Sequence, residues 1–564
     1  MRIINHKITV EDLAIILWIF MVTIFFALFF KYGYISFEQN DDMFISTIPS
    51  GIYGHHYIYT SFSNILQGIF LVGLSKFMPI CNWTIVLYVG YVYISYIGIG
   101  VWAIKIKGAL TGVCLSALLF WTTYRSLLHD MNFSKTGGVL MGVGLAIFAH
   151  YSKELCGKKN TIFLLISGIM IFAGGLVRRD SIIAAIPFIM ILAIDTVLWS
   201  KDKGIKIIKK SVPWLILALF IVTAWMVDTI AYEVNEEWRS YKEFNSIRAN
   251  LDDYGMLDYE THQEIYQEIG YNHIDVRMLS SWHSADSEVF SAENLKEIIR
   301  NKERKEYSLE NIKQSLEKTY EKVIKDNNMF TVIVVLTLVC GLTGGKKLFL
   351  LIPNFLLLIL ELFYLVFGGR YPERATLLVF MYAFAVLIYA FPQKEELKKV
   401  KYGLVAGILL FLVAGGLYNN NFDQITEESD SEEYAHKEEY RQFLFEISEQ
   451  QENLYVWDIF AIEKVLEEAY TPYEAFDFGV LSNSVYTGGW FVNTPIMANN
   501  AERFGEKNNP YKLLANSGNV FLVTRAGTDI NDTLSYIRRH YNEDANSRCV
   551  SELNEIVVYS FAAE

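Results

Sequence analysis

Cysteine is scarce in this chain and follows no pattern typical of a metal site or a disulfide framework. The five cysteines are Cys81, Cys114, Cys156, Cys340 and Cys549. None belongs to a Cys-x-x-Cys pair or to a Cys/His cluster. The sequence therefore suggests neither a disulfide scaffold nor a zinc site.

Nucleotide-binding glycine motifs are also missing. The chain has no P-loop and no Gly-x-Gly-x-x-Gly unit with a following acidic residue. No tandem repeat stands out, and nothing resembles a cleavable signal peptide, because the first apolar run is long and no small-residue cleavage pattern follows it. We interpret that run as a retained membrane anchor.

Apolar residues are abundant. The mean hydropathy of the 564 residues is +0.24, with 52% hydrophobic and 15% aromatic residues. These values predict a polytopic α-helical membrane protein that carries sizeable soluble parts. The net charge of −13 is concentrated in two polar regions, Glu233–Asp326 and Asn419–Glu564. The negative charge therefore belongs to solvated domains and gives no reason to expect a nucleic-acid partner.

Eleven apolar runs are candidates for transmembrane helices. They cover residues 11–30, 83–104, 108–124, 137–151, 160–177, 181–199, 211–232, 329–343, 346–367, 375–391 and 402–418. Several are at the short end of the usual ~17–25 residues, so we expect their ends to extend into the flanks. One further apolar stretch, Phe62–Ile80, is ambiguous by hydropathy alone.

Lysine-rich loops resolve this ambiguity. Basic residues gather in the N-terminus (Arg2, Lys7) and in the loops at 105–107, 153–159, 201–210, 346–347 and 394–401. All of these become cytoplasmic if Phe62–Ile80 does not cross the membrane. We therefore predict that this stretch is an interfacial helix on the outer face. The protein then has about 11 transmembrane helices in the cell membrane, with a cytoplasmic N-terminus and an extracytoplasmic C-terminus.

This topology predicts four parts. An N-terminal transmembrane module, 1–232, contains the first outer loop, 31–82. An outer loop, 233–328, is expected to be helical because Trp238, Tyr241, Phe244 and Ile247 follow helical spacing. Further transmembrane helices occupy 329–418. The last part, 419–564, mixes helical stretches with short β-rich runs such as Leu454–Trp457, which predicts an extracytoplasmic α/β domain.

The first outer loop carries two adjacent carboxylates, Asp41 and Asp42, next to the end of the first span. Acids so close to a membrane interface, in a basic neighbourhood, are well placed for acid–base catalysis on a membrane-anchored substrate. A solvated turn and part of a cation site are the alternative interpretations. No clear third ligand accompanies the pair, so we predict no tightly bound metal and no cofactor, although a divalent cation is possible.

Cations gather on the same predicted outer side, against the usual charge bias. They are Arg178, Arg179, Arg370, Arg374 and Lys135, with the histidines His55 and His56. Arginine binds phosphate oxygens with a planar fork, so this set suits an anionic phosphate held at headgroup depth. Contact with lipid headgroups is the alternative for each arginine, and an ordinary interfacial position is the alternative for each histidine.

The N-terminal third resembles the GT-C superfamily of membrane glycosyltransferases. The residues that carry the resemblance are the acidic loop Asn40-Asp41-Asp42-Met43-Phe44, the small-residue turn Pro49–Gly54, and the stretch from His55 to Gly68. Asn132–Thr136 and Arg178–Ser181 resemble later outer segments of such enzymes. Uncharacterised Gram-positive cell-surface polysaccharide proteins are similar also in the segments 238–254 and 369–374. The Lys-Pro-Pro segment that some members carry after the acidic loop is absent here, and His55 and His56 occupy that region.

The resemblance implies a function. Such enzymes transfer a sugar from a polyprenyl-phosphate donor to a glycan or lipid acceptor on the outer face of the bilayer, usually with inversion. It implies Asp41 as general base with support from Asp42, and the seven basic residues named above as candidates for binding the donor phosphate.

Three other functions remain open at this point. A flippase or transporter of lipid-linked oligosaccharide would explain acids within or near spans, of which Glu361 is the strongest example. A polysaccharide polymerase or ligase shares the lipid-phosphate donor but does not need an acidic pair in the first loop. A sensor or scaffold would use its outer domains to bind a ligand.

Overall fold

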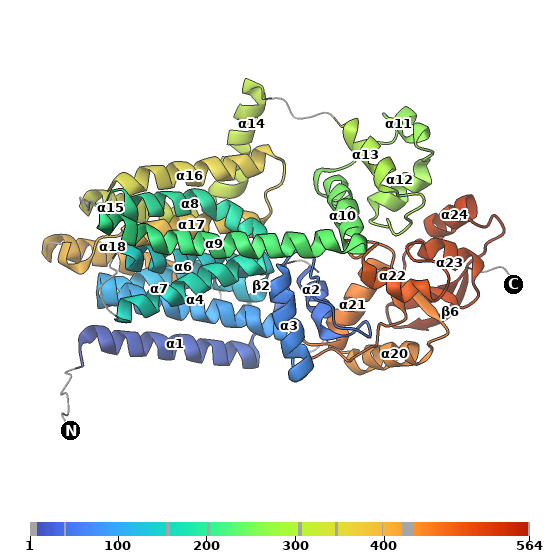
Figure 1. Cartoon of the computed structure of the whole chain (residues 1–564), viewed down its shortest axis with the longest axis horizontal. Helices are drawn as coiled ribbons and strands as arrows, with labels where there is room; N and C mark the ends of the chain where they lie inside the picture. The colour runs from blue at the N-terminus through green and yellow to red at the C-terminus, as the bar shows by residue number, and fades with distance from the viewer. Residues whose placement is uncertain are drawn as a thin grey trace.

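The computed structural model describes residues 8–38, 41–153, 158–199, 204–302, 307–343, 348–396, 399–419 and 434–561. Arg2, Lys7, Cys156, Lys346 and Lys347, with the start of the 201–210 loop and residues 420–433, lie outside these ranges. Figure 1 shows a bundle of long helices at one end of the molecule and smaller helices and strands at the other. We call the latter the outer elements, and residues 434–561 among them the outer domain, after their predicted orientation.

Each of the eleven predicted apolar runs forms a helix. The helices are α1 (Val10–Tyr32), α4 (Trp83–Lys107), α5 (Ala109–Tyr124), α6 (Phe133–Lys153), α7 (Lys158–Val177), α8 (Arg179–Val197), α9 (Ile205–Val234), α15 (Asn328–Thr343), α16 (Leu348–Phe367), α17 (Glu373–Ala390) and α18 (Lys399–Asn419). An α-helix satisfies its backbone polar groups internally, which is why apolar runs can occupy lipid in this form. Buried α6 and α17 form the centre of the bundle, whereas α1 exposes large apolar side chains along its length.

Within the described ranges, seven of these helices are long and apolar enough to cross a membrane: α1, α4, α7, α8, α9, α16 and α17. An eighth candidate joins α15 to the preceding helical segment Leu309–Ile324 across a 96° bend. This composition supports a polytopic helical membrane protein. The finer count of eleven crossings and the orientation stay predictions.

The first outer loop consists of short elements packed against the bundle. A two-residue strand β1 (Ser36–Phe37) pairs in parallel with β2 (Asp130–Met131), and helix α2 (Asp41–Ser50) follows. The stretch predicted to lie at the interface forms α3 (Ile65–Phe77), which has 13 residues. A crossing helix needs about 20 residues, so α3 is too short to span a bilayer by itself.

The segment 233–328 is helical, as its spacing predicted. It contains α10 (Glu236–Tyr254), α11 (Gln263–Glu268), α12 (His273–Ser280), α13 (Ala292–Arg300), α14 (Leu309–Thr319) and the π-helical turn η2 (Tyr320–Ile324); a similar turn, η1 (Arg125–His129), precedes β2. Trp238, Tyr241, Phe244 and Ile247 are all buried on one face of α10. A short 3₁₀ turn, η3 (Lys394–Glu396), lies at the other end of the bundle.

The C-terminal residues 434–561 form the predicted α/β domain. Its helices are α20 (Lys437–Glu449), α21 (Ile459–Ala469), α22 (Pro495–Glu502), α23 (Pro510–Asn516) and α24 (Asn531–His540). Its strands are β3 (Leu454–Trp457), β4 (Ser484–Tyr486), β5 (Val520–Arg525), β6 (Arg548–Leu553) and β7 (Ile556–Ser560). In the described residues the strand order is β4-β3-β5-β7-β6, with β3 parallel to both neighbours and β7 antiparallel to β5 and β6. Every residue of β3 is buried, as expected for a central parallel strand covered on both faces.

The carboxyl ends of the parallel strands face the membrane bundle. The chain leaves β3 through α21 to reach β4 on one side, and then returns through α22 and α23 to β5 on the other side, so the connections diverge at β3. Ligands of open α/β sheets bind at such a divergence. At this edge the Tyr486 hydroxyl lies 2.8 Å from that of Tyr53. Before the amino end of β4, Leu481 N–H donates to Ile52 O at 2.9 Å. The outer domain is thus joined directly to the segment after α2.

Candidate functional site

A cavity of about 730 Å³ lies between the helix bundle and the outer elements. The wall on the side of the helix bundle comes from the start of α2, the segment before α3, and the ends of α8, α9 and α17. Its outer wall comes from α10, Trp282, the start of α21 and the loop Gly489–Phe491. Residues from opposite ends of the sequence therefore line one cavity.

Asp41 begins α2 and lines this cavity. The indole N–H of Trp490 donates to Asp41 Oδ1 at 2.9 Å. Burial raises the pKa of Asp41, and the nearby positive charges of Arg374 and Arg178 oppose that rise. A half-buried carboxylate with one oxygen held and a raised pKa is suited to accept a proton.

Asp42 occupies a different environment, although it is the next residue. Its side chain is fully buried and lies outside the cavity lining. Its carboxylate accepts the Phe133 backbone N–H at 2.6 Å and Asn132 Nδ2–H at 3.0 Å. Burial, and then the charge on Asp41, raise the pKa of Asp42 well above its ordinary value. Asp42 therefore joins the start of α2 to the start of α6, and we no longer assign it a catalytic role.

Four predicted arginines line the cavity: Arg178, Arg179, Arg370 and Arg374. Arg178 forms an ion pair with Asp180 at 2.7 Å, and its guanidinium lies 5.0 Å from the ring centre of Phe133. Arg179 lies 5.2 Å from the ring centre of Trp225.

The other two arginines come from the segment between α16 and α17 and from α17 itself. Arg370 forms an ion pair with Asp253, and Arg374 forms one with Glu38 at 3.4 Å. A guanidinium has five N–H donors, so each arginine can hold a carboxylate and still contact an incoming phosphate oxygen.

Helix α10 supplies two further cations that the sequence analysis missed. Lys242 Nζ lies 3.8 Å from Asp228 and 3.3 Å from the ring centre of Tyr232, and burial lowers the pKa of this lysine. Arg248 forms an ion pair with Asp252. Lys242, Asn245, Arg248 and Asp252 follow one another at intervals of three, three and four residues and all line the cavity. That polar repeat beside the apolar stripe is the signal that could have revealed the two cations.

The described lining residues carry balanced charge. Six are cationic: Arg178, Arg179, Lys242, Arg248, Arg370 and Arg374. Six are acidic: Asp41, Asp180, Asp228, Asp252, Asp253 and Glu463. An anion that enters must therefore share the arginines with existing carboxylates, which makes its affinity depend on guanidinium geometry more than on net charge.

Lys135 lies outside the cavity lining. Its Nζ is fully buried, lies 3.0 Å from Glu38 and 3.6 Å from Glu373, and donates to Asp130 O at 3.1 Å. These partners join α6, the first outer loop and the start of α17. The contacts indicate a structural ion-pair network, so we do not retain Lys135 as a phosphate ligand.

His55 and His56 also lie outside the cavity lining. His56 Nδ1 lies 2.8 Å from Pro49 O, and its ring packs 5.6 Å from that of Phe478 in the outer domain. His55 is exposed beside Tyr57. His56 belongs to the contact between the segment after α2 and the outer domain, whereas His55 contacts only its own segment in the part of the chain that the structure describes. Neither position fits the predicted phosphate role.

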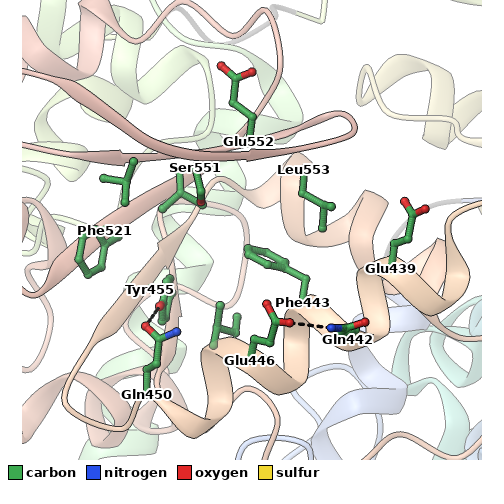
Figure 2. A pocket seen from close by; sticks show the side chains of 13 residues that line it. Glu439, Gln442, Phe443, Glu446, Gln450, Tyr455, Phe521, Ser551, Glu552 and Leu553 are labelled. Carbon is green, nitrogen blue, oxygen red and sulfur yellow. Dashed lines mark hydrogen bonds between the residues drawn. The ribbon is translucent and has the colours of Figure 1, made fainter.

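A second cavity, of about 440 Å³, lies on the outer domain between α20 and the β6–β7 hairpin. Figure 2 shows Glu439, Glu446 and Glu552 around it, with Phe443 and Phe521 among the other residues that line it. Its described lining contains no lysine or arginine. The surface therefore does not suit a phosphate, and the cavity at Asp41 is the better candidate site.

No group of three or more His, Cys, Asp or Glu side chains among the described residues could hold a metal ion. Comparison with protein-family models found no match, and comparisons with curated proteins and with solved structures found none either.

Proposed function

We propose that this protein is an integral-membrane glycosyltransferase that takes a sugar from a polyprenyl-phosphate donor and passes it to an acceptor at the outer face of the membrane. The observation that carries this proposal is the single cavity that contains Asp41 and four arginines at the end of the helix bundle. The GT-C-like first outer loop supports the same assignment.

In this mechanism Asp41 is the general base. Its Oδ1 is held by Trp490, which leaves Oδ2 to accept the proton of an acceptor hydroxyl. The acceptor oxygen attacks the anomeric carbon as the bond from that carbon to the phosphate oxygen breaks. The bonding electrons leave with the lipid phosphate, whose added negative charge is stabilised by Arg178, Arg370 and Arg374.

The wall of the cavity on the side of the helix bundle suits a lipid-linked donor. Asn64 and Asp228 line the cavity where α3 meets α9, and Asp228 accepts the Ile65 N–H at 2.8 Å. Farther along the same two helices, Phe70 of α3 and Ile230 of α9 expose apolar side chains. A polyprenyl chain can lie against such a surface in the bilayer while its phosphate occupies the cavity.

The test is transfer in vitro by the purified full-length chain from a labelled polyprenyl-phosphate sugar. Asp41→Asn keeps the shape and the hydrogen bond but removes the basicity, so we expect kcat to fall by ~10²–10⁴-fold. Asp544→Asn, which changes an exposed acid of the outer domain, is the matched control. Full turnover in Asp41→Asn would refute this carboxylate as the base.

A further inference from the structure

Trp282 has an unusual backbone conformation for a large side chain. Helix α12 ends in a Schellman motif, in which Trp282 N–H donates to Leu279 O at 3.1 Å and His283 N–H donates to Met278 O at 2.9 Å. This motif places Trp282 in the left-handed region, with φ of 68°. Glycine is the usual residue there, because a Cβ is disfavoured in this conformation. Strain of this kind points toward a role for the side chain.

Packing does not explain the tryptophan. Its side chain is 44% exposed and lines the cavity that contains Asp41. No aromatic or cation–π contact of Trp282 exists within the described residues. By contrast, the Trp490 ring packs on Phe62 and Phe491 and donates to Asp41. The indole of Trp282 therefore leaves an aromatic face open to a ligand.

The backbone around Trp282 is held firmly against the outer domain. Gly489 N–H donates to Trp282 O at 3.3 Å, and a Cβ added at Gly488 would lie 1.9 Å from the same oxygen. His283 Nε2 lies 2.7 Å from Asp458, the residue that follows β3 and caps α21. The open indole is therefore fixed at the carboxyl edge of the parallel strands, where open α/β sheets bind ligands.

We propose that Trp282 is the stacking surface for a sugar ring of the acceptor, and that the acceptor is therefore a glycan. This inference rests on the proposed function. The C–H face of a pyranose is apolar and packs on an indole, while its hydroxyls turn toward polar groups. Phe460, at the start of α21, is a second exposed aromatic side chain of the same outer wall.

The position of Trp282 assigns it to the acceptor and not to the donor. The donor phosphate belongs at headgroup depth, with the arginines at the ends of the bundle helices. Trp282, Phe460 and Glu463 come from outer elements and form the opposite wall. A sugar stacked on Trp282 approaches Asp41 from the aqueous side.

Trp282→Gly separates a binding role from a structural one. Glycine is favoured at this left-handed position, so the melting temperature should stay the same or rise. The acceptor KM should rise by about tenfold, the scale of one lost aromatic contact, while the donor KM is unchanged. Trp282→Phe keeps a ring and should recover part of the loss. Phe445→Ala is the matched control, because Phe445 is 43% exposed in the same half of the molecule and lies outside this cavity.

A binding measurement keeps this inference distinct from the proposed reaction. Calorimetric titration of the full-length chain with short neutral oligosaccharides of glucose, galactose and N-acetylglucosamine needs no turnover. We expect at least one to bind the parental protein and the control variant Phe445→Ala equally, and to bind Trp282→Gly about tenfold more weakly. That result would stand even if no sugar transfer were found. Equal binding to Trp282→Gly, an unchanged acceptor KM, or no binding of any oligosaccharide to the parental protein would overturn the inference.

Discussion

The two ends of the helix bundle carry positive charge in different ways. At the end away from the outer domain, lysines contact a carboxylate or backbone carbonyl groups: Lys394 pairs with Glu11 at 2.7 Å, Lys153 lies 3.5 Å from Asp195, and Lys107 donates to Tyr389 O at 3.1 Å and also to Phe391 O. At the other end, Arg178, Arg179, Arg370 and Arg374 line one cavity. In the predicted orientation, the lysine end follows the usual charge bias of membrane proteins, whereas the arginine end departs from it.

This contrast indicates that the geometry of the cationic side chains matters more for binding an anion than the number of positive charges. An ammonium is a point charge that one carboxylate or a few carbonyl groups can satisfy, whereas a guanidinium is a planar fork. Exchanging lysine and arginine at the two ends therefore has unequal expected effects. The predictions below test this asymmetry and the roles of the residues between the two walls of the cavity.

The largest expected effect is at the arginine end. Arg374→Lys keeps the charge but removes the fork beside Asp41, so we expect kcat to fall on the order of 10²-fold. The measurement is steady-state transfer from the polyprenyl-phosphate sugar. A parental kcat in Arg374→Lys would show that the geometry of this cation does not matter.

A smaller effect on stability is expected at Asp42. Asp42→Ala leaves the buried Phe133 N–H and the Asn132 amide without their acceptor, which costs about 1–3 kcal/mol. Asp42→Asn retains an acceptor oxygen and should cost less. Thermal unfolding in detergent measures both variants. A larger loss of stability in Asp42→Asn than in Asp42→Ala would contradict the proposed hydrogen-bonding role.

The pH dependence of transfer should report the contact between Trp490 and Asp41. Burial raises the pKa of Asp41, and the Trp490 hydrogen bond lowers it. Activity needs the ionised carboxylate, so the rate falls as the pH falls through this pKa. Trp490→Phe removes the N–H donor and raises the pKa of Asp41 further, which moves the acid limb of kcat/KM to higher pH. Near neutral pH the loss should be less than about tenfold. An acid limb that moves to lower pH would exclude this donor role.

The smallest effect is expected at the lysine end. Lys394→Arg keeps the charge opposite Glu11 at an exposed position, so transfer activity and melting temperature should match those of the parent. The same two assays as above measure it. If this exchange reduced activity as strongly as Arg374→Lys, the asymmetry between the two ends would disappear.

Local periodicity determined much of this fold. The helical spacing of Trp238, Tyr241, Phe244 and Ile247 predicted the buried face of α10, and the β-rich run Leu454–Trp457 coincides with β3. All eleven apolar runs form helices. These features follow from the sequence because they depend on residues only a few positions apart, through helical and strand repeats and through the need to bury apolar side chains.

The tertiary structure alone decided which charged residues share a site. Asp41 and Asp42 are adjacent and alike in sequence, yet neighbouring positions of a helix point about 100° apart, so one meets the cavity and the other meets α6. Trp490 reaches Asp41 from 449 positions away. Lys135 has the same charge as the arginines, but it is buried beside the carboxylates of Glu38 and Glu373. Such contacts depend on how distant elements pack, and no local pattern along the chain encodes that packing.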